Sequence, residues 1–228
     1  MAMSYGAGSH HQYSGSPVTG FPFTIVIWGN FPQSTSTRIP MSMGYSAGPT
    51  GCFAIEFGSA STGFRGVSGS GGIARVITVN HPTGMGGTID NWIHFAYVCT
   101  STTNRKAYIN AGLPTVGASG SQTTDASFDP GTNRTGQNVR FLGTVGLQAP
   151  ARYAEFAIYN ASLNDDEIKA LYSGMSPTHI RPQNLEFYVP GIREVGTGKA
   201  LQELTNNYAF IANGPAGITQ FDHPRRYN

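Results

Sequence analysis

Charged residues are scarce in this sequence: Asp, Glu, Lys and Arg make up 11% of its 228 residues, whereas globular proteins average about 25%. The formal net charge is +2, and Lys and Arg form no run beyond Arg225-Arg226. Because phosphate binding depends on clustered cations, we expect no nucleic-acid partner. A surface this neutral indicates either broad contact with other protein or a coat of solvated Ser, Thr and Asn side chains.

Long apolar segments are also missing, since no stretch approaches the roughly 20 apolar residues of a membrane-spanning helix. Residues 1–20 are rich in Gly, Ser, His and Tyr and hold no apolar core typical of a secretory signal. We therefore expect no membrane partner. For export, we expect either that a signal has been removed or that the protein is made in a host cytoplasm and not exported by that route.

The residue patterns of common catalytic and metal sites are missing as well. Of the 12 acidic residues, only Asp165 and Glu167 stand two positions apart, the spacing that would put the two carboxylates of a retaining glycosidase on one face of a strand. A helix start explains that pair. The six His form no metal-ligand spacing, and there is no nucleophile-elbow motif. We therefore expect a protein that is not an enzyme.

Cysteine is nearly missing. Cys52 and Cys99 each lie in or at the end of an apolar run. Their spacing matches no metal site, and a chain made inside a cell stays reduced, so buried free thiols are favoured over a disulfide between them.

What the sequence does have is the composition of a β-rich fold, with 30 Gly, 14 Pro, 11% aromatic residues and short apolar runs between polar turns. The runs predict strands over residues 21–31, 39–46, 52–58, 64–68, 73–79, 92–99, 106–110, 139–143 and 185–190. Strand 92–99 is apolar on both faces, and Trp92, His94 and Ala96 share one of them. We expect Trp92 and His94 to pack in the core rather than to form a functional site.

One short helix is predicted over residues 164–173. Asn164 is a typical N-cap, Glu167 completes a capping box, and Gly174 supplies a left-handed stop. A helix of about two and a half turns is too short to stand alone and must dock on a larger body. The docking residues are expected to be Ile168, Leu171 and Tyr172.

Four units in this order resemble a known family. They are Trp92-Ile93-His94-Phe95-Ala96-Tyr97-Val98, Tyr108-Ile109-Asn110-Ala111-Gly112, Leu142-Gly143 and the strand, corner and helix of 155–172. They are similar to those of laminin G-like domains, a branch of the concanavalin A-like lectin and glucanase sandwiches, over residues 20–174. The resemblance implies an all-β, two-sheet antiparallel jelly-roll sandwich with one short helix and with extended N- and C-terminal arms. Ala111 stands where the family usually has Gly.

Composition and resemblance together divide the chain into a flexible N-terminal arm over 1–20, a laminin G-like sandwich over 21–176 and a C-terminal extension with additional strands over 177–228. Laminin G-like domains often bind calcium at a loop rim. Asp125 and Asp129 are the only neighbouring carboxylates available for such a site, and two ligands in one loop are few for calcium. We therefore expect no cofactor, with calcium at this loop as the alternative.

The C-terminal extension, ending in Asp222-His223-Pro224-Arg225-Arg226-Tyr227, looks like sandwich proteins of tailed bacteriophages. With the low charge and the missing signal, this resemblance predicts a non-enzymatic structural protein on the virion surface, most simply a capsid decoration or cement protein. Its partners would be the major capsid protein or other virion proteins, and further copies of itself in a homo-oligomer. The expected contact residues are Tyr5, Tyr13, Phe21, Arg225, Arg226 and Tyr227.

The alternative is a carbohydrate-binding, lectin-like module, either free or displayed on a virion as an adhesin for host glycans. Tyr and Trp rings stack on the apolar faces of sugars. The glycan contacts expected in that case are Tyr45, Tyr153 and Tyr159.

Overall fold

The structure is a computed structural model of the 228-residue chain. It describes residues 2–5, 10–14, 17–18, 20–30, 38–44, 52–57, 64–70, 73–79, 92–113, 118–122, 138–141, 151–190, 194–195, 200–202, 205, 209–213 and 219–221.

Within these ranges the chain is mostly β-strand. One group of strands comprises β1 (Ala2–Tyr5), β3 (Phe23–Asn30), β8 (Ile93–Ser101), β9 (Asn104–Ile109), β10 (Ala118–Gln122), β12 (Ala151–Tyr159), β13 (Leu185–Val189) and β17 (Thr219–Phe221). The other comprises β2 (His10–Ser14), β4 (Arg38–Gly44), β5 (Cys52–Phe57), β6 (Phe64–Ser70), β7 (Ile73–Val79), β11 (Asn138–Phe141), β14 (Glu194–Val195), β15 (Ala200–Gln202) and β16 (Ala209–Asn213). The helical elements are α1 (Asp165–Tyr172) and the 3-10 turns η1 (Asn110–Gly112), η2 (Pro177–His179) and η3 (Pro182–Asn184).

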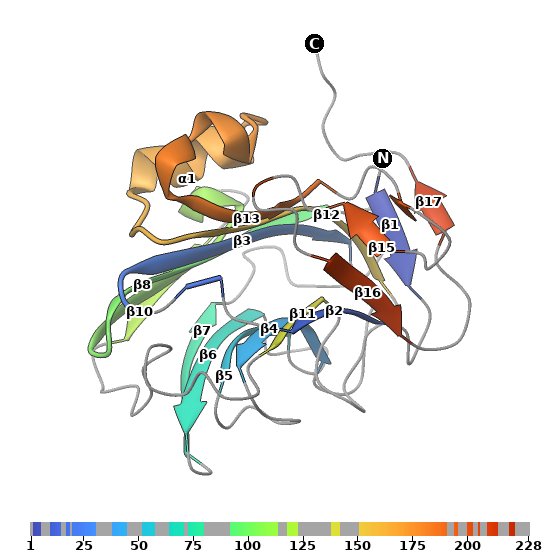
Figure 1. Ribbon diagram of the computed structural model, residues 1–228. Helices are drawn as coiled ribbons and strands as arrows, with labels where there is room; N and C mark the ends of the chain where they lie inside the picture. Colours follow the sequence, from blue (N-terminus) through green and yellow to red (C-terminus); the bar gives the residue numbers. More distant parts are fainter. Residues whose placement is uncertain are drawn as a thin grey trace.

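The two groups form two antiparallel sheets that stack face to face (Figure 1). The first, sheet A, has the order β10-β9-β8-β3-β12-β1-β17, and β13 also pairs with β12. The second, sheet B, has the order β14-β15-β16-β2-β11-β4-β5-β6-β7. The described residues therefore confirm the predicted two-sheet β-sandwich with a single α-helix.

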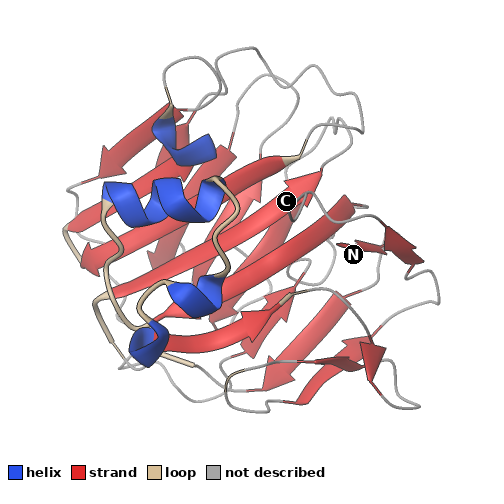
Figure 2. Cartoon of the chain, turned by 90° about the horizontal axis from the view of Figure 1, so that it is seen from above, coloured by secondary structure: helices blue, strands red, loops and turns tan. Residues whose placement is uncertain are grey.

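Strands β3 and β8, in the middle of sheet A, are buried on both faces. The Tyr97 ring points toward sheet B, since a Cβ added to Gly66 of β6 would lie 2.7 Å from it. Ile25 is the cross-strand partner of Tyr97 and is fully buried on the same side. The opposite face, here called the outer face, carries Val26 and Ala96 and packs against the helix (Figure 2). Burial on two sides explains why β3 and β8 are apolar at nearly every position.

Helix α1 begins as predicted. The Asn164 side chain accepts hydrogen bonds from the backbone N–H groups of Asp166 (3.0 Å) and Glu167 (2.9 Å). The Glu167 carboxylate in turn accepts from the Asn164 N–H at 2.8 Å, which completes the capping box. Ile168 and Leu171 are buried against the outer face, as expected. Neither α1 nor any other helix of the described part is long and apolar enough to cross a membrane.

The N-terminal segment differs from its prediction. Residues 1–20 were expected to form a flexible arm, but Ala2–Tyr5 and His10–Ser14 are strands β1 and β2. Strand β1 pairs with β12 and β17, and β2 pairs with β11 and β16. Hydrogen bonds between backbone groups hold these short strands in the sheets. Such pairing leaves no apolar pattern in a Gly- and Ser-rich segment, so the sequence did not predict the strands.

Two further expectations can be compared with the structure around β8. The gap between the strands predicted over 92–99 and 106–110 is shorter in the structure, because β8 extends to Ser101 and β9 begins at Asn104, so that the buried Arg105 belongs to a strand. Cys99 is a free, fully buried thiol, as favoured from the sequence. The side chain of Cys52 lies outside the described part.

Candidate functional site

Four ring-bearing side chains gather on the outer face of sheet A at the end of α1. Trp28 of β3 and His94 of β8 are cross-strand partners, and their ring centroids lie 5.2 Å apart. The Tyr172 ring, on the last residue of α1, stacks on Trp28 at 5.7 Å with 15° between the ring planes. Trp92, just before β8, packs against the same group. We call Trp28, Trp92, His94 and Tyr172 the aromatic cluster.

The aromatic cluster has a buried floor and a partly exposed rim. Trp28 is 9% exposed and His94 is 1% exposed, whereas Trp92 and Tyr172 are only partly buried. Ala154 of β12 is the neighbour of Trp28 on the other side, and its small side chain leaves room for the indole ring. The stacked pair Trp28–Tyr172 contributes about 0.5–1.5 kcal/mol beyond its buried area and anchors the end of the helix.

The strand end that carries Trp92 and His94 is held by Asn110. The chain leaves β9 in a left-handed turn, with φ of 46° at Asn110, 58° at Ala111 and 69° at Gly112. Asn is among the residues that tolerate this conformation. Its Oδ1 accepts a hydrogen bond from the His94 N–H at 3.0 Å. The β8–β9 ladder is thereby extended by one bond, which positions His94 beside Trp28.

A β-bulge on β12 puts a buried carboxyl group near the same face. The register of β12 against β3 shifts between Ala154 and Ala157, and Glu155 within the bulge has a φ of 53°. Glu155 is 2% exposed and accepts a 2.7 Å hydrogen bond from the Tyr188 hydroxyl. Bulges of this kind re-aim single side chains out of the regular alternation.

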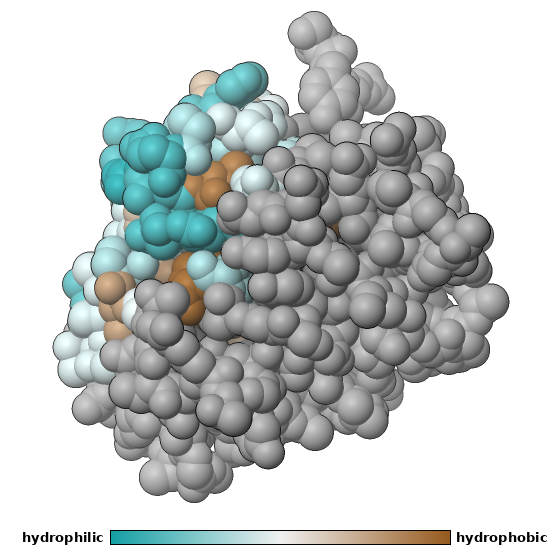
Figure 3. Space-filling model, viewed as in Figure 1, coloured by the Kyte–Doolittle hydropathy of each residue, from teal (hydrophilic) through white to brown (hydrophobic). Residues whose placement is uncertain are grey.

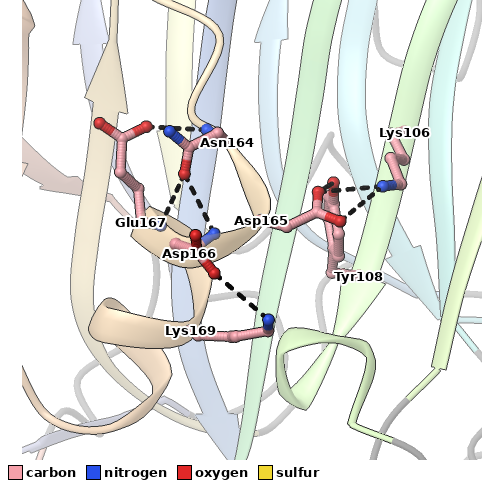
Figure 4. Close-up of polar contacts among 7 residues, drawn as sticks. All are labelled: Lys106, Tyr108, Asn164, Asp165, Asp166, Glu167 and Lys169. Carbon is pink, nitrogen blue, oxygen red and sulfur yellow. Dashed lines mark hydrogen bonds and ion pairs between the residues drawn. The ribbon is translucent and has the colours of Figure 1, made fainter.

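Ion pairs surround α1 and the turns that follow it, residues 164–184, which we call the helical cap. The pairs are Lys106–Asp165 (3.0 Å), Lys169–Asp166 (3.3 Å) and Arg181–Glu167. Figure 4 shows the first two, together with the Tyr108 hydroxyl that donates to Asp165 at 2.6 Å. Hydrophilic residues accordingly gather over the cap side of the molecule, with apolar patches beside them (Figure 3).

The contact between β9 and the helix start changes three pKa values. The hydrogen bonds from Tyr108 and then Lys106 hold the pKa of Asp165 below its ordinary value. Burial, and then the hydrogen bond to Asp165, raise the pKa of Tyr108 to about 12. The pKa of Lys106 is raised, chiefly by Tyr108. At neutral pH the contact therefore joins an ammonium, a phenol and a carboxylate, which suits a structural clasp between strand and helix.

The described ranges contain no candidate metal site, because no three His, Cys, Asp or Glu side chains of those residues lie close together. Asp125 and Asp129, the carboxylates considered for calcium, lie outside the described residues.

Of the three predicted glycan contacts, the structure describes the side chain of one, Tyr159. Tyr159 is a correction: its side chain is fully buried under the helical cap, and its hydroxyl donates to the Pro177 carbonyl at 3.0 Å. A ring enclosed in this way cannot stack on a sugar. Tyr153 lies in β12 in register with Met3 and Gly29, but its side chain is outside the described part. Tyr45 lies outside the described residues.

The predicted partner contacts are spread over the molecule where they can be located. Tyr5 ends β1 in sheet A, whereas Tyr13 lies in β2 of sheet B. Phe21 is partly buried and its ring stacks on Phe23 at 5.5 Å. Tyr5 and Tyr13 are thus not brought onto one sheet. Arg225, Arg226 and Tyr227 lie outside the described residues.

The aromatic cluster was only half visible in the sequence. Strand alternation put Trp92 and His94 on one face, and His94 is buried as expected, whereas Trp92 is partly exposed. Their association with Trp28 and Tyr172 depends on cross-strand register and on where the helix lands. One signal that could have indicated the cluster is that the chain has only two Trp, and both lie in segments predicted to be strands, residues 21–31 and 92–99.

Comparison with known proteins gives the fold. The sequence matches no protein-family model and no curated protein. A putative carbohydrate binding protein from Bacteroides ovatus ATCC 8483 superposes on 100% of this chain with a TM-score of 0.67 and 17% sequence identity. The chain spans 61% of that protein's length. The heptameric SAP-like pentraxin from Limulus polyphemus superposes on 96% of this chain and 93% of its own, with a TM-score of 0.60 and 12% identity.

A bacteriophage protein is also similar. The enzymatically active domain of tailspike protein 2 from bacteriophage CBA120 covers 77% of this chain and 27% of its own, with a TM-score of 0.53 and 13% identity. Identities this low show the fold and nothing finer. The concanavalin A-like superfamily, its laminin G-like branch and the phage origin stay predictions. The chain shares the β-sandwich fold of these proteins.

Proposed function

We propose that this chain is a carbohydrate-binding β-sandwich module, which is the alternative function considered from the sequence. The observation that carries the proposal is the superposition of the whole chain on a protein described as a putative carbohydrate binding protein, with a TM-score of 0.67. The aromatic cluster supports it, because partly exposed Trp and Tyr rings are the side chains that stack on sugars. Trp92 and Tyr172 supply two such rings on one face.

We further propose binding without hydrolysis. A retaining glycosidase needs two carboxyl groups about 5 Å apart that both reach the substrate. The acidic residues of the helical cap are engaged in structural contacts instead: Asp165 with Tyr108 and Lys106, and Glu167 with the helix N-cap. Glu155 is buried and bonded to Tyr188. These contacts favour a binding role for the face described here.

Display on a virion is a second candidate, favoured by the similarity to a bacteriophage tailspike domain. In this role the module would hold host glycans from the virion surface, as part of a homo-oligomer. Capsid decoration, with the major capsid protein as partner, is the narrower form of this candidate. Counting the copies per purified particle by quantitative mass spectrometry would test it: hundreds favour decoration, a handful favours a tail or spike, and none contradicts both.

A glycan array probed with the purified chain tests the main proposal. We expect binding to a defined set of saccharides, reproduced by isothermal titration calorimetry with the free sugar. The heat-unfolded chain serves as the control, because binding that survives unfolding does not need the sandwich. A folded chain that binds no saccharide above background would contradict the proposal, and release of reducing sugar from a bound glycan would contradict the binding-only role.

A further inference from the structure

The rim of the aromatic cluster offers flat apolar surface at the end of α1. Trp92 and Tyr172 are partly exposed, and they rest on the floor formed by Trp28 and His94. The Tyr172 ring stacks on the Trp28 ring with 15° between the two ring planes, so one face of the Tyr172 ring rests on the floor. A pyranose ring carries an apolar face of C–H groups, which stacks on an indole or phenol ring in the same way as another aromatic ring does.

The floor contains a hydrogen-bond donor for which the described residues provide no acceptor. The Trp28 Nε1 atom is buried, and no acceptor among the described side chains or backbone groups lies within hydrogen-bond distance. A buried N–H without an acceptor destabilises a protein, and nearly all such groups in native structures find a partner. The hydroxyl groups of a sugar are acceptors of the required kind.

The charges of the helical cap bear on the kind of sugar. Lys106, Lys169 and Arg181, the described Lys and Arg residues of the helical cap and of its contact with β9, each form an ion pair with an acidic residue. Glu155 near this face is buried, and its carboxyl group accepts a hydrogen bond from Tyr188. An anionic sugar is bound best by an uncommitted Arg or Lys. The pairs leave none of these three cations free for that role.

We infer that the outer face of sheet A at the aromatic cluster is a glycan-binding surface, with Trp92 as its stacking residue, and that it takes neutral rather than sialylated sugars. The inference rests on the proposed function and narrows it to one face and one class of ligand. It also sets the site apart from Tyr45, Tyr153 and Tyr159, the glycan contacts expected from the sequence.

Intrinsic fluorescence makes the test specific, because both Trp of the chain belong to the cluster. The intact chain is titrated with lactose, maltotriose and chitotriose, and with 3′-sialyllactose as the anionic counterpart of lactose. We expect at least one neutral sugar to shift the emission and to protect Trp92 from iodide quenching. Trp92→Ala should weaken that sugar's binding about tenfold, or about 1.4 kcal/mol, and Trp92→Phe should weaken it less.

Calorimetry on the same variants separates the outcomes. Met175→Ala, which changes an exposed apolar residue after α1, is the matched control and should bind as the unmodified chain does. If a sugar binds without any change in emission or quenching and with equal affinity to Trp92→Ala, the site lies elsewhere while the proposed function stands. Tighter binding of 3′-sialyllactose than of lactose overturns the neutral class. Failure of every neutral sugar to bind overturns the inference, and an empty glycan array overturns the proposed function as well.

Discussion

The Tyr108 hydroxyl donates a 2.6 Å hydrogen bond to Asp165 Oδ1 and thereby ties strand β9 to the first residue of α1, 57 positions along the chain. Lys106 lies on the same strand two residues earlier and adds an ion pair to the same carboxylate at 3.0 Å. Its ammonium nitrogen is also 4.8 Å from the centroid of the Tyr108 ring. The start of the helix is therefore fixed by the strand as well as by its own capping box.

This relationship predicts coupling between Tyr108 and Asp165. Tyr108→Phe and Asp165→Asn should each lower the free energy of unfolding by about 1 kcal/mol, a modest value because Asp165 is exposed. The double variant should lose less than the sum of the two, because Tyr108→Phe removes the same hydrogen bond that Asp165→Asn weakens by taking away the carboxylate charge. Urea unfolding measures all three. Lys169→Ala, which breaks an exposed pair with Asp166, is the control and should cost under about 0.5 kcal/mol. Additive losses would show that the bond contributes nothing.

Acid should weaken the same contact. The pKa of Asp165 is lower in the folded protein than its ordinary value of 3.8, so the carboxylate stabilises the fold above that pH. The contribution is lost as the pH falls through the folded pKa. Asp165→Asn should therefore be less stable than the unmodified chain at neutral pH, and the difference should shrink below about pH 4. Urea unfolding over a pH series checks this. A difference that does not change with pH would exclude the charge as its source.

The capping box predicts a further loss. Asn164→Ala removes the acceptor of two backbone N–H groups and should lower the free energy of unfolding by about 1 kcal/mol. Asn164→Asp keeps an acceptor at the positive end of the helix and should stay within about 0.5 kcal/mol of the unmodified chain. Thermal and urea unfolding give both values. Equal losses in the two variants would mean that the side-chain oxygen is not the stabilising group.

Close packing between the sheets can be tested at Gly66. A Cβ there would lie 2.7 Å from two ring carbons of Tyr97, and overpacking of this kind costs about 1–3 kcal/mol. Gly66→Ala should lower the free energy of unfolding by that amount. Gly20→Ala is the matched control, because no heavy atom lies within 4 Å of its added Cβ, and it should change stability by less than about 0.5 kcal/mol. A neutral Gly66→Ala variant would indicate that the sheets lie farther apart.

Cys99 should be chemically silent in the folded protein. Burial raises the pKa of its thiol, and the side chain is fully enclosed, so the reactive thiolate is neither formed nor reached. In a Cys52→Ser background, where Cys99 is the only thiol, iodoacetamide should label the chain in denaturant and leave it unlabelled in native buffer. Rapid labelling of the native chain, at the rate seen in denaturant, would contradict the buried position.

The parts of the fold that could be predicted are those with local signals. The capping box of Asn164 and Glu167 was found because its donors and acceptors lie within four residues of one another. Strand β8 was found because its apolar residues are contiguous. Strands β1 and β2 were missed, because Ala2–Tyr5 and His10–Ser14 owe their structure to partners such as β12 and β11, far along the chain.

The candidate site likewise combines features that local sequence patterns predict with features that depend on distant parts of the chain. Sequence by itself determined a β-rich sandwich, one capped helix and the alternation that puts Trp92 and His94 on one face, because side-chain periodicity and capping act over neighbouring residues. Only the tertiary structure decided that Tyr159 is enclosed, that Trp28 lies beside His94, and that Tyr172 stacks on Trp28. Register between distant strands and the landing place of a helix depend on the packing of the whole core, so no local pattern specifies which aromatic rings are buried and which reach the surface.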